Sequence, residues 1–403
     1  MARIPMRAAP GGVTAPAGFA AAGASAGIKR GRKPDLALVA CDRVAAAAAV
    51  FTRNRIQAAP VVISRRRVRR GSARAVLINS GCANCLTGPA GMRDALALGR
   101  EAARALGVAE PSVLLASTGL IGRRLPASRI LRAVPALAAS LGRAGHRRAA
   151  EAILTTDLAP KEAAVEARVG GRRVRVGGMA KGAGMIAPSM ATMLCVLTTD
   201  ADVEPSLLRS LLQTAVARTF NRISVDGDMS TNDTVFALAS GASGVRIRQG
   251  SRAEALRSML EAVAGRLAEA IVRDGEGATR VMDVRVEGAR TDREAQRCAR
   301  QVAASPLVKT MLAGGDPNVG RIAGAVGASG ARFAPARMEI RLGPRLVVAG
   351  GAALDVPRGA VRAWLRRPTV PVRIHLHAGR GAGRMLTCDL TEAYVRINTG
   401  YAT

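Results

Sequence analysis

The sequence predicts a layered α/β fold, because strand-like and helix-like patterns alternate along the whole chain. Short apolar runs rich in valine, leucine and isoleucine are the expected strands. Longer alanine-rich stretches with apolar residues three or four positions apart are the expected helices. Hydrophobic residues make up 49% of the 403 residues and aromatic residues only 2%, so the core must consist mainly of small aliphatic side chains. This length suits two lobes or one large two-layer unit.

The expected elements can be placed in chain order. The strands cover residues 73–79, 113–116, 174–178, 193–198, 281–286 and 372–376, with a hairpin over 338–348. The helices cover residues 94–106, 128–142, 207–219 and 252–273. The strand over 281–286 alternates apolar with charged residues, which indicates a half-buried strand. Apart from the alanine run over 45–49, no low-complexity segment separates two domains, and no repeat of 20–50 residues is visible.

The charge of the chain raises the question of nucleic-acid binding. Lysine and arginine number 60 against 29 acidic residues, a net charge of +31. Single-strand binders need aromatic stacking platforms, which this chain lacks, and no zinc-finger or aromatic RNA-binding spacing is present. The densest basic run, residues 65–70, is expected to be a solvated loop before a strand. We therefore expect no nucleic-acid partner, although a basic binding protein remains the alternative from another class.

Metal, redox and membrane functions are also poorly supported. Cys82 and Cys85 form a lone CxxC, expected to be two buried thiols because a zinc site needs a second pair. His375 and His377 would share one strand face, but no further ligands accompany them. Gly23–Gly27 matches a nucleophile-elbow string without the strand and helix that this motif needs. No run approaches the ~20 apolar residues of a membrane helix, so we expect a cytoplasmic protein with no membrane partner.

The centre of the chain carries the pattern most typical of a reactive site. Residues 177–184 contain four glycines, which allow backbone amides to approach a ligand closely. Lys181 lies among them, in a chain with five lysines in total. Thr192 follows at the edge of an expected buried strand. Physical reasoning alone leaves open whether this is a reactive segment or a turn into a core strand.

This central segment resembles the self-cleavage region of the ornithine acetyltransferase family, the bifunctional glutamate N-acetyltransferase/amino-acid acetyltransferases. In that family the chain is cut at the Ala-Thr bond of a Met-Ala-Thr-Met-Leu context, which here is Ala191–Thr192. The resemblance extends over the whole chain. Its further landmarks lie within residues 12–19, 79–88, 116–122, 155–161, 221–234, 315–321 and 389–398.

The resemblance implies a layered α/β sandwich of the self-processing N-terminal-threonine type, which the family shares with certain aminopeptidases. Fragments 1–191 and 192–403 would share one core and assemble as an α₂β₂ heterotetramer. Thr192 would be the nucleophile, and Thr118 and Gly119 would stabilise the oxyanion. The implied substrate-binding residues are Thr155, Lys181, Thr192, Glu276, Asn398 and Thr403.

The implied reaction moves an acetyl group from N2-acetylornithine to glutamate through an acetyl-Thr192 intermediate. A free α-amine has a pKa near 7.7–8.0, so the new N-terminus can act as its own general base without a histidine. No cofactor or metal is needed, and whether acetyl-CoA also serves as a co-substrate is left open. The alternatives are a self-processing aminopeptidase or other acyltransferase of this fold, or an uncleaved structural protein.

The sequence departs from the family pattern at three places. Cys82 stands where the family usually has Asn or Gly, and Cys85-Leu86 replaces an Ala-Cys pair. Val319 stands where the family usually has Trp. These departures bear on local packing and on substrate fit, and none falls on Thr192, Thr118, Gly119 or Lys181.

Overall fold

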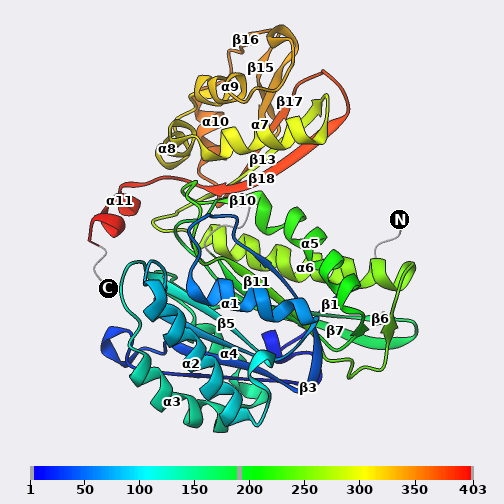
Figure 1. The fold of residues 1–403 in the computed structure, drawn as a ribbon. Coiled ribbons are helices and arrows are strands. Elements are labelled where there is room, and N and C mark those ends of the chain that lie inside the picture. Colours follow the sequence, from blue (N-terminus) through cyan, green and yellow to red (C-terminus); the bar gives the residue numbers. More distant parts are fainter. Residues whose placement is uncertain (1–3, 188–192, 401–403) are drawn as a thin grey trace.

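The computed structural model describes residues 4–187 and 193–400, which form a large lobe and a small lobe (Figure 1). Within these residues, nine strands of the large lobe form one mixed sheet in the order β1-β6-β7-β8-β11-β3-β4-β5, with β2 beside β3. The strands are β1 (Arg7–Ala8), β2 (Phe19–Ala24), β3 (Leu36–Phe51), β4 (Ser72–Cys82), β5 (Val113–Leu120), β6 (Lys161–Val169), β7 (Arg172–Lys181), β8 (Leu194–Thr199) and β11 (Thr234–Ala239). The layered α/β prediction is confirmed.

The long strand β3 carries the sheet from one layer of the lobe to the other. In the first half of β3, Leu38 packs into the core between the sheet and the helices that cover it. Val39 points the other way, into the core between the two layers of the sheet. The same inward core contains Val196 of β8, so two parts of one sheet pack face to face. The β3–β4 register shifts between Ala40 and Ala45, as at a bulge that bends a strand.

Helices cover both outer faces of this sandwich, so the large lobe has an α/β/β/α layering (Figure 1). On one side lie α1 (Ala59–Arg67), α2 (Gly88–Leu106) and α3 (Ala127–Ala139), and on the other α5 (Pro205–Arg218) and α6 (Ser251–Arg273). The short α4 (His146–Ala152) packs against β2 and β3 and contributes to the inner core. The predicted helices over 94–106, 128–142, 207–219 and 252–273 correspond to α2, α3, α5 and α6.

The small lobe has a core of its own around a second sheet, whose described strands follow the order β10-β18-β13-β17-β14-β15-β16. The strands are β10 (Ile223–Ser224), β13 (Val281–Ala289), β14 (Glu339–Leu342), β15 (Arg345–Ala349), β16 (Ala352–Ala353), β17 (Thr369–His375) and β18 (Gly381–Cys388). Its helices are α7 (Asp292–Ala304), α8 (Pro306–Gly314), α9 (Val319–Gly327) and α10 (Arg358–Leu365). Strand β10 comes from the chain between α5 and β11, so it joins the two lobes. The predicted hairpin and the strands over 281–286 and 372–376 are confirmed.

Strands on both sides of position 192 belong to the same sheet. Residues 176–181 of β7 pair antiparallel with residues 194–199 of β8, and β11 pairs with both β8 and β3. The division into fragments 1–191 and 192–403 stays a prediction. A break between them would leave this pairing available to hold the fragments together.

Two sequence-based expectations need correction. The alanine run over 45–49 is no linker: it lies in β3 and pairs with β11, since buried alanines fit closely packed layers. The basic run over 65–70 is not a loop but the end of α1 and a short 3-10 turn. There Arg67 is buried and donates to the Val113 carbonyl (2.6 Å) and to Glu110 (2.6 Å). The strand over 281–286, expected to be half-buried, also buries Asp283, whose carboxylate accepts hydrogen bonds from Arg285 and Arg384.

No helix in the part of the chain that the structure describes is both long enough and apolar enough to cross a membrane.

Phe236 offers a test of the two-layer core. It is fully buried on β11, and its ring meets Phe51 edge to face with centroids 6.1 Å apart. We expect Phe236→Ala to lower the free energy of unfolding by about 3–5 kcal/mol, because the structure cannot refill so large a space. Urea denaturation measures this loss. Leu158→Ala is the control: this side chain is 88% exposed, so a change within about 0.5 kcal/mol is expected. Equal effects would contradict the core assignment.

Candidate active site

A pocket of about 180 Å³ opens where β5 and β7 end and where the loops before β6 and after α6 meet α11 (Glu392–Thr399). Six residues singled out from the sequence line it: Thr118, Gly119, Thr155, Lys181, Glu276 and Asn398. Ala191, Thr192 and Thr403, also singled out, lie outside the described residues. The structure therefore brings together segments up to 280 positions apart in the sequence, from Thr118 to Asn398.

Strand β5 presents Thr118 and Gly119 to this pocket. Gly119 has φ +127°, and a side chain there would overlap the backbone of Gly81 on the neighbouring strand β4. Only glycine meets both demands, the positive φ and the close approach. The backbone at Gly119 is thus positioned by direct strand-to-strand contact.

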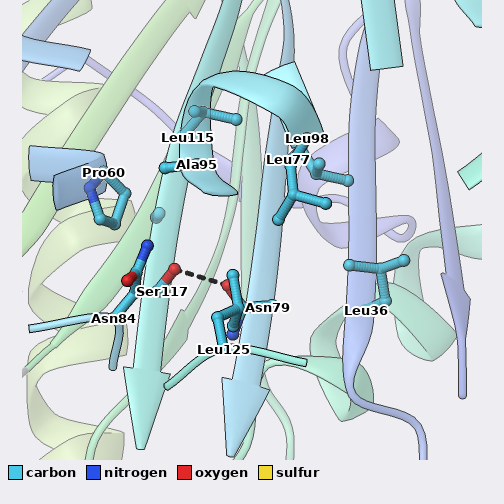
Figure 2. Close-up of a pocket in the computed structure, with 11 residues that line it drawn as sticks. Leu36, Pro60, Leu77, Asn79, Asn84, Ala95, Leu98, Leu115, Ser117 and Leu125 are labelled. Atoms are coloured by element: carbon cyan, nitrogen blue, oxygen red, sulfur yellow. Dashed lines mark hydrogen bonds between the residues drawn. The ribbon is translucent and has the colours of Figure 1, made fainter. Parts of the chain in front are cut away.

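The residue before Thr118 faces the opposite side of the strand, as the alternation of side chains requires. Figure 2 shows Ser117 directed toward Asn79, and its hydroxyl donates to Asn79 Oδ1 at 2.5 Å. Asn79 in turn donates to the Cys82 carbonyl at 2.9 Å. The cavity beside them has about 10 Å³, room for one water molecule at most, so it is a packing void rather than a substrate site.

Lys181 ends β7 with its ammonium group inside the protein, where the residue is 2% exposed. Its Nζ donates to the hydroxyls of Thr155 (2.7 Å) and Thr118 (3.3 Å). Asp157 lies 3.8 Å away as its counter-charge. Burial lowers the pKa of Lys181, and Asp157 offsets part of that effect. The amine therefore orients two hydroxyls that line the pocket.

Asp157 is the ionic partner of Lys181 and is not among the candidate site residues predicted from the sequence. Its carboxylate accepts hydrogen bonds from Lys161 Nζ (2.7 Å), the Gly182 amide (2.6 Å) and the Thr155 amide (3.0 Å). Burial by itself would raise the pKa of Asp157, but Lys181, Lys161 and these donors hold it well below its usual range. Asp157 is thus ionised and fixes the two threonine-bearing segments relative to β7.

Two neighbouring residues, Asn232 and Asp233, connect the pocket to the start of β8. Asn232 Nδ2 donates to the carbonyls of Ser117 (2.8 Å) and Ala83 (2.7 Å). Asp233 Oδ1 accepts from the amide of Met193 at 2.9 Å, the residue that follows Thr192. Burial raises the pKa of Asp233 well above the ordinary value. The sequence contained these residues as part of a family landmark but gave no sign of their contacts.

The C-terminal helix supplies the far wall of the pocket. Asn398 Nδ2 donates to Glu276 Oε2 at 2.8 Å, and the Glu276 amide donates to the Ala183 carbonyl at 2.8 Å. A side chain at Gly184 would displace the Glu276 carboxylate, because a Cβ there would lie 2.5 Å from it. The glycines near Lys181 thus let a carboxylate approach the backbone closely.

The remaining sequence features lie elsewhere or do no chemistry here. Cys82 and Cys85 are buried free thiols, as predicted. The rings of His375 and His377 lie 3.8 Å apart, but His377 has left the strand with φ +47°. No group of three potential metal ligands occurs among residues 4–187 and 193–400. Val319 packs against the small-lobe core, away from the pocket.

The fold and pocket define a layered α/β enzyme whose site consists of hydroxyl, amide, ammonium and carboxylate groups. The sequence model of the ArgJ family matches residues 20–403. Two proteins called arginine biosynthesis bifunctional protein ArgJ are similar over nearly the whole chain. The one from Symbiobacterium thermophilum is 48% identical and covers 98% of this chain and 99% of its own. The one from Synechocystis is 45% identical and covers 98% of both.

The chain therefore belongs to the ArgJ family, and it is an acyltransferase of arginine biosynthesis. A chloroplastic relative from Ricinus communis is 47% identical and covers 99% of this chain and 88% of its own. A crystal structure of the ArgJ protein of Bacillus halodurans is 38% identical with a TM-score of 0.50. It matches 51% of this chain and 98% of the solved one.

Replacing Asp157 tests the buried charges beneath the pocket. Asp157→Asn leaves Lys181 without its counter-charge, so we expect a loss of about 3–5 kcal/mol of stability at pH 7. Because the folded-state pKa of Asp157 is depressed, its contribution is present above pH ~4 and is lost as the pH falls through the folded-state value. The difference in the free energy of unfolding between the wild type and Asp157→Asn should therefore become smaller below pH ~4. Urea denaturation at several pH values measures it.

Glu101→Gln, which removes an exposed pair with Arg104, serves as the control and should change stability by no more than about 0.5 kcal/mol. A gap between wild type and Asp157→Asn that stays constant from pH 7 to pH 3 would contradict an ionised Asp157.

Proposed function

We propose that this chain cleaves itself between Ala191 and Thr192 and then uses Thr192 to transfer the acetyl group of N2-acetylornithine to glutamate. One observation carries the proposal: the hydroxyl of Thr118, the ammonium of Lys181 and the carboxylate of Glu276 line one pocket. Met193, the next residue after Thr192, is joined to the same site through Asp233.

The length of the solved relative supports cleavage near the middle of the chain. The Bacillus halodurans chain aligns over 98% of its length and yet covers 51% of this chain. A chain about half as long is what a cut at Ala191–Thr192 would produce. The pairing of β7 with β8 gives the two fragments a reason to stay together.

Self-cleavage begins with the Thr192 hydroxyl attacking the carbonyl carbon of Ala191. The peptide C–N bond breaks as the ester C–O bond forms, and water then hydrolyses the ester. The released α-amine has a pKa near 7.7–8.0, which suits a general base at neutral pH. In turnover the threonine hydroxyl attacks the acetyl carbonyl, ornithine leaves, and the amine of glutamate takes the acetyl group from the ester. Ping-pong kinetics follow from this order.

Both stages pass through a tetrahedral oxyanion, for which the Thr118 hydroxyl and the Gly119 amide are the proposed donors. The contact with Lys181 supports this role. Its ammonium donates to the Thr118 oxygen, so the hydroxyl hydrogen of Thr118 is free to point toward an oxyanion. The positive charge nearby also favours developing negative charge.

Glu276 is the proposed partner of the ornithine side-chain ammonium, and Asn398 holds its carboxylate in place. Lys181 already donates to two hydroxyls, and its third N–H is the one left for Asp157 or for a substrate carboxylate. Contacts to Thr155, Asn398 and Thr403, the use of acetyl-CoA, the α₂β₂ assembly and the cytoplasmic location stay predictions.

Intact mass under denaturing conditions tests the first step. We expect two fragments, the second beginning with Thr192, and a single uncut chain for Thr192→Ala. An uncut wild-type chain after long incubation would contradict the proposal. Incubation of the cut protein with N2-acetylornithine and glutamate should then yield N-acetylglutamate. Release of amino acids from peptides without that product would favour an aminopeptidase instead.

Removing the Thr118 hydroxyl tests the oxyanion assignment. We expect Thr118→Val to lower the turnover number on the order of 10²–10³-fold, since one oxyanion donor is lost while the shape is kept. Thr118→Ser keeps the hydroxyl and should stay within about tenfold of the wild type. Acetyl transfer and self-cleavage are both followed by mass spectrometry. Equal activity of the valine and serine variants would remove Thr118 from the mechanism.

A further inference from the structure

The segment Ser230–Thr234 holds the two halves of the site at a fixed spacing. Asn232 bonds the Ser117 carbonyl, which positions Thr118 and Gly119. The next residue, Asp233, bonds the amide of Met193 at 2.9 Å, and the Thr234 amide donates to the Met193 carbonyl at 3.1 Å. Met193 is therefore held at both its amide and its carbonyl by this one segment.

Asp233 differs from the other buried aspartates of the large lobe. It is 0% exposed, and its Oδ2 has no hydrogen-bond partner among the described residues, although the Ser230 hydroxyl lies near enough to favour the ionised form. In Asp200, by contrast, both carboxylate oxygens accept backbone amides, from Arg175 (2.8 Å) and Ala17 (3.3 Å). A buried carboxyl oxygen without a partner is costly, so its presence beside Met193 calls for a functional explanation.

Covalent geometry limits where this carboxyl group can act. The nitrogen that Asp233 holds is the nitrogen of the Thr192–Met193 peptide bond, and only two atoms of the Thr192 backbone separate it from the Thr192 nitrogen. With standard bond lengths these two nitrogens lie roughly 3–3.5 Å apart. Asp233 Oδ1, 2.9 Å from the first nitrogen, is therefore at most about 6.5 Å from the second, near enough for the carboxyl group to meet it after a side-chain rotation.

We propose that Asp233 carries the proton from the hydroxyl of Thr192 to the nitrogen of Thr192 during self-cleavage. This inference rests on the proposed function. Attack by the hydroxyl on Ala191 creates an ester bond and breaks the Ala191–Thr192 peptide bond, so the hydroxyl must lose a proton and the departing nitrogen must gain one. The protonated carboxyl of Asp233 donates its proton to that nitrogen and takes the hydroxyl proton in return, so Asp233 ends as it began.

The surroundings keep Asp233 in the form that this step needs. Complete burial disfavours its charge and raises its pKa, and Lys181 is the charged residue that opposes this effect. Lys181 is itself engaged by Asp157, which lies 3.8 Å from its ammonium. The site thus contains one ionised aspartate that neutralises the lysine and a second aspartate, bonded to the Met193 amide, whose neutral form is favoured by burial.

The test uses full-length precursor made by in vitro translation, with cleavage followed over time by mass spectrometry. Asp233→Asn keeps an oxygen to accept the Met193 amide but cannot release a proton in this way. We expect its cleavage to be at least about 10²-fold slower than that of the wild type, the usual contribution of acid–base catalysis. Asp200→Asn, which alters a buried aspartate at the far end of β8, is the matched control and should cleave at the wild-type rate. Cleavage of Asp233→Asn within threefold of the wild type would overturn the proposal.

Hydroxylamine shows whether a slow variant fails to form the ester or fails to hydrolyse it, because the reagent cleaves esters and leaves amides intact. If Asp233 acts in the N-to-O shift, no ester forms in Asp233→Asn and hydroxylamine will not restore cleavage. Rapid cleavage of the variant on adding hydroxylamine would mean that the ester had formed without Asp233, and the proposal would be wrong.

The pH dependence of cleavage is a second test, and its first part uses the wild-type precursor alone. The rate should fall as the pH rises through the raised pKa of Asp233, because the donor is then lost. The groups that face Asp233 are the Ser230 hydroxyl, the Met193 amide and the ammonium of Lys181. If the fall in cleavage rate at high pH came from Lys181, it would persist in a folded Asp233→Asn variant. If the fall came from Asp233, it would disappear in that variant.

A cleavage rate that stays constant from the pH at which ordinary carboxyl groups titrate up to neutral pH would count against the proposal. A wild-type chain that is never cut would instead remove the proposed function itself, so cleavage of the wild type distinguishes the two failures. Thr192→Ala is the negative control: it must remain uncut at every pH and with hydroxylamine, because it lacks the attacking hydroxyl.

Discussion

The burial of the Lys181 ammonium is the constraint on which the rest of the site depends. An ammonium ion removed from water is stable only with a counter-charge and with hydrogen-bond acceptors for its protons. Asp157 supplies the charge, and the hydroxyls of Thr118 and Thr155 accept two of the hydrogen bonds. These partners come from a strand and a loop far from Lys181 in sequence. Meeting the needs of one lysine therefore fixes the positions of three chain segments around the pocket.

Two buried aspartates next to pocket-lining residues have opposite environments. Asp157 is surrounded by two ammonium groups and backbone amides, which favour its charged form. Asp233 is fully buried and accepts a backbone amide at one oxygen, while its other oxygen has no partner among the described residues, so its neutral form is favoured. When neighbouring carboxyl groups have pKa values pushed apart in this way, one serves as a fixed charge and the other can exchange protons. This division follows from what surrounds each group, since the two side chains are chemically identical.

The large lobe gives these groups a rigid frame. Strand β3 lets a single sheet form both inner layers, so the oxyanion segment on β5 and the start of β8 rest on the same inner core. Segment 230–234 then ties the two together by hydrogen bonds from adjacent residues. The small lobe has a separate core, and the chain that follows it contributes α11 and Asn398 to the pocket wall. The site thus rests on the sheet at the start of β8 and is completed from the C-terminal end.

The sequence by itself determined the layered α/β class, eight of the eighteen described strands and the chemical identity of the central segment, because periodicity and a reactive motif are local properties. It also singled out Thr118, Lys181 and Glu276 through ordered landmarks. It did not predict β3 as a strand, because an alanine run has weak strand preference and only pairing with β4 and β11 makes it one.

The tertiary structure alone decided that Asp157 neutralises Lys181 and that Asn232 and Asp233 bracket the site. It alone also showed that one oxygen of Asp233 has no hydrogen-bond partner within residues 4–187 and 193–400. Burial, counter-charge and hydrogen-bond satisfaction depend on residues tens to hundreds of positions away. For that reason no pattern within the segment 230–234 could have revealed them.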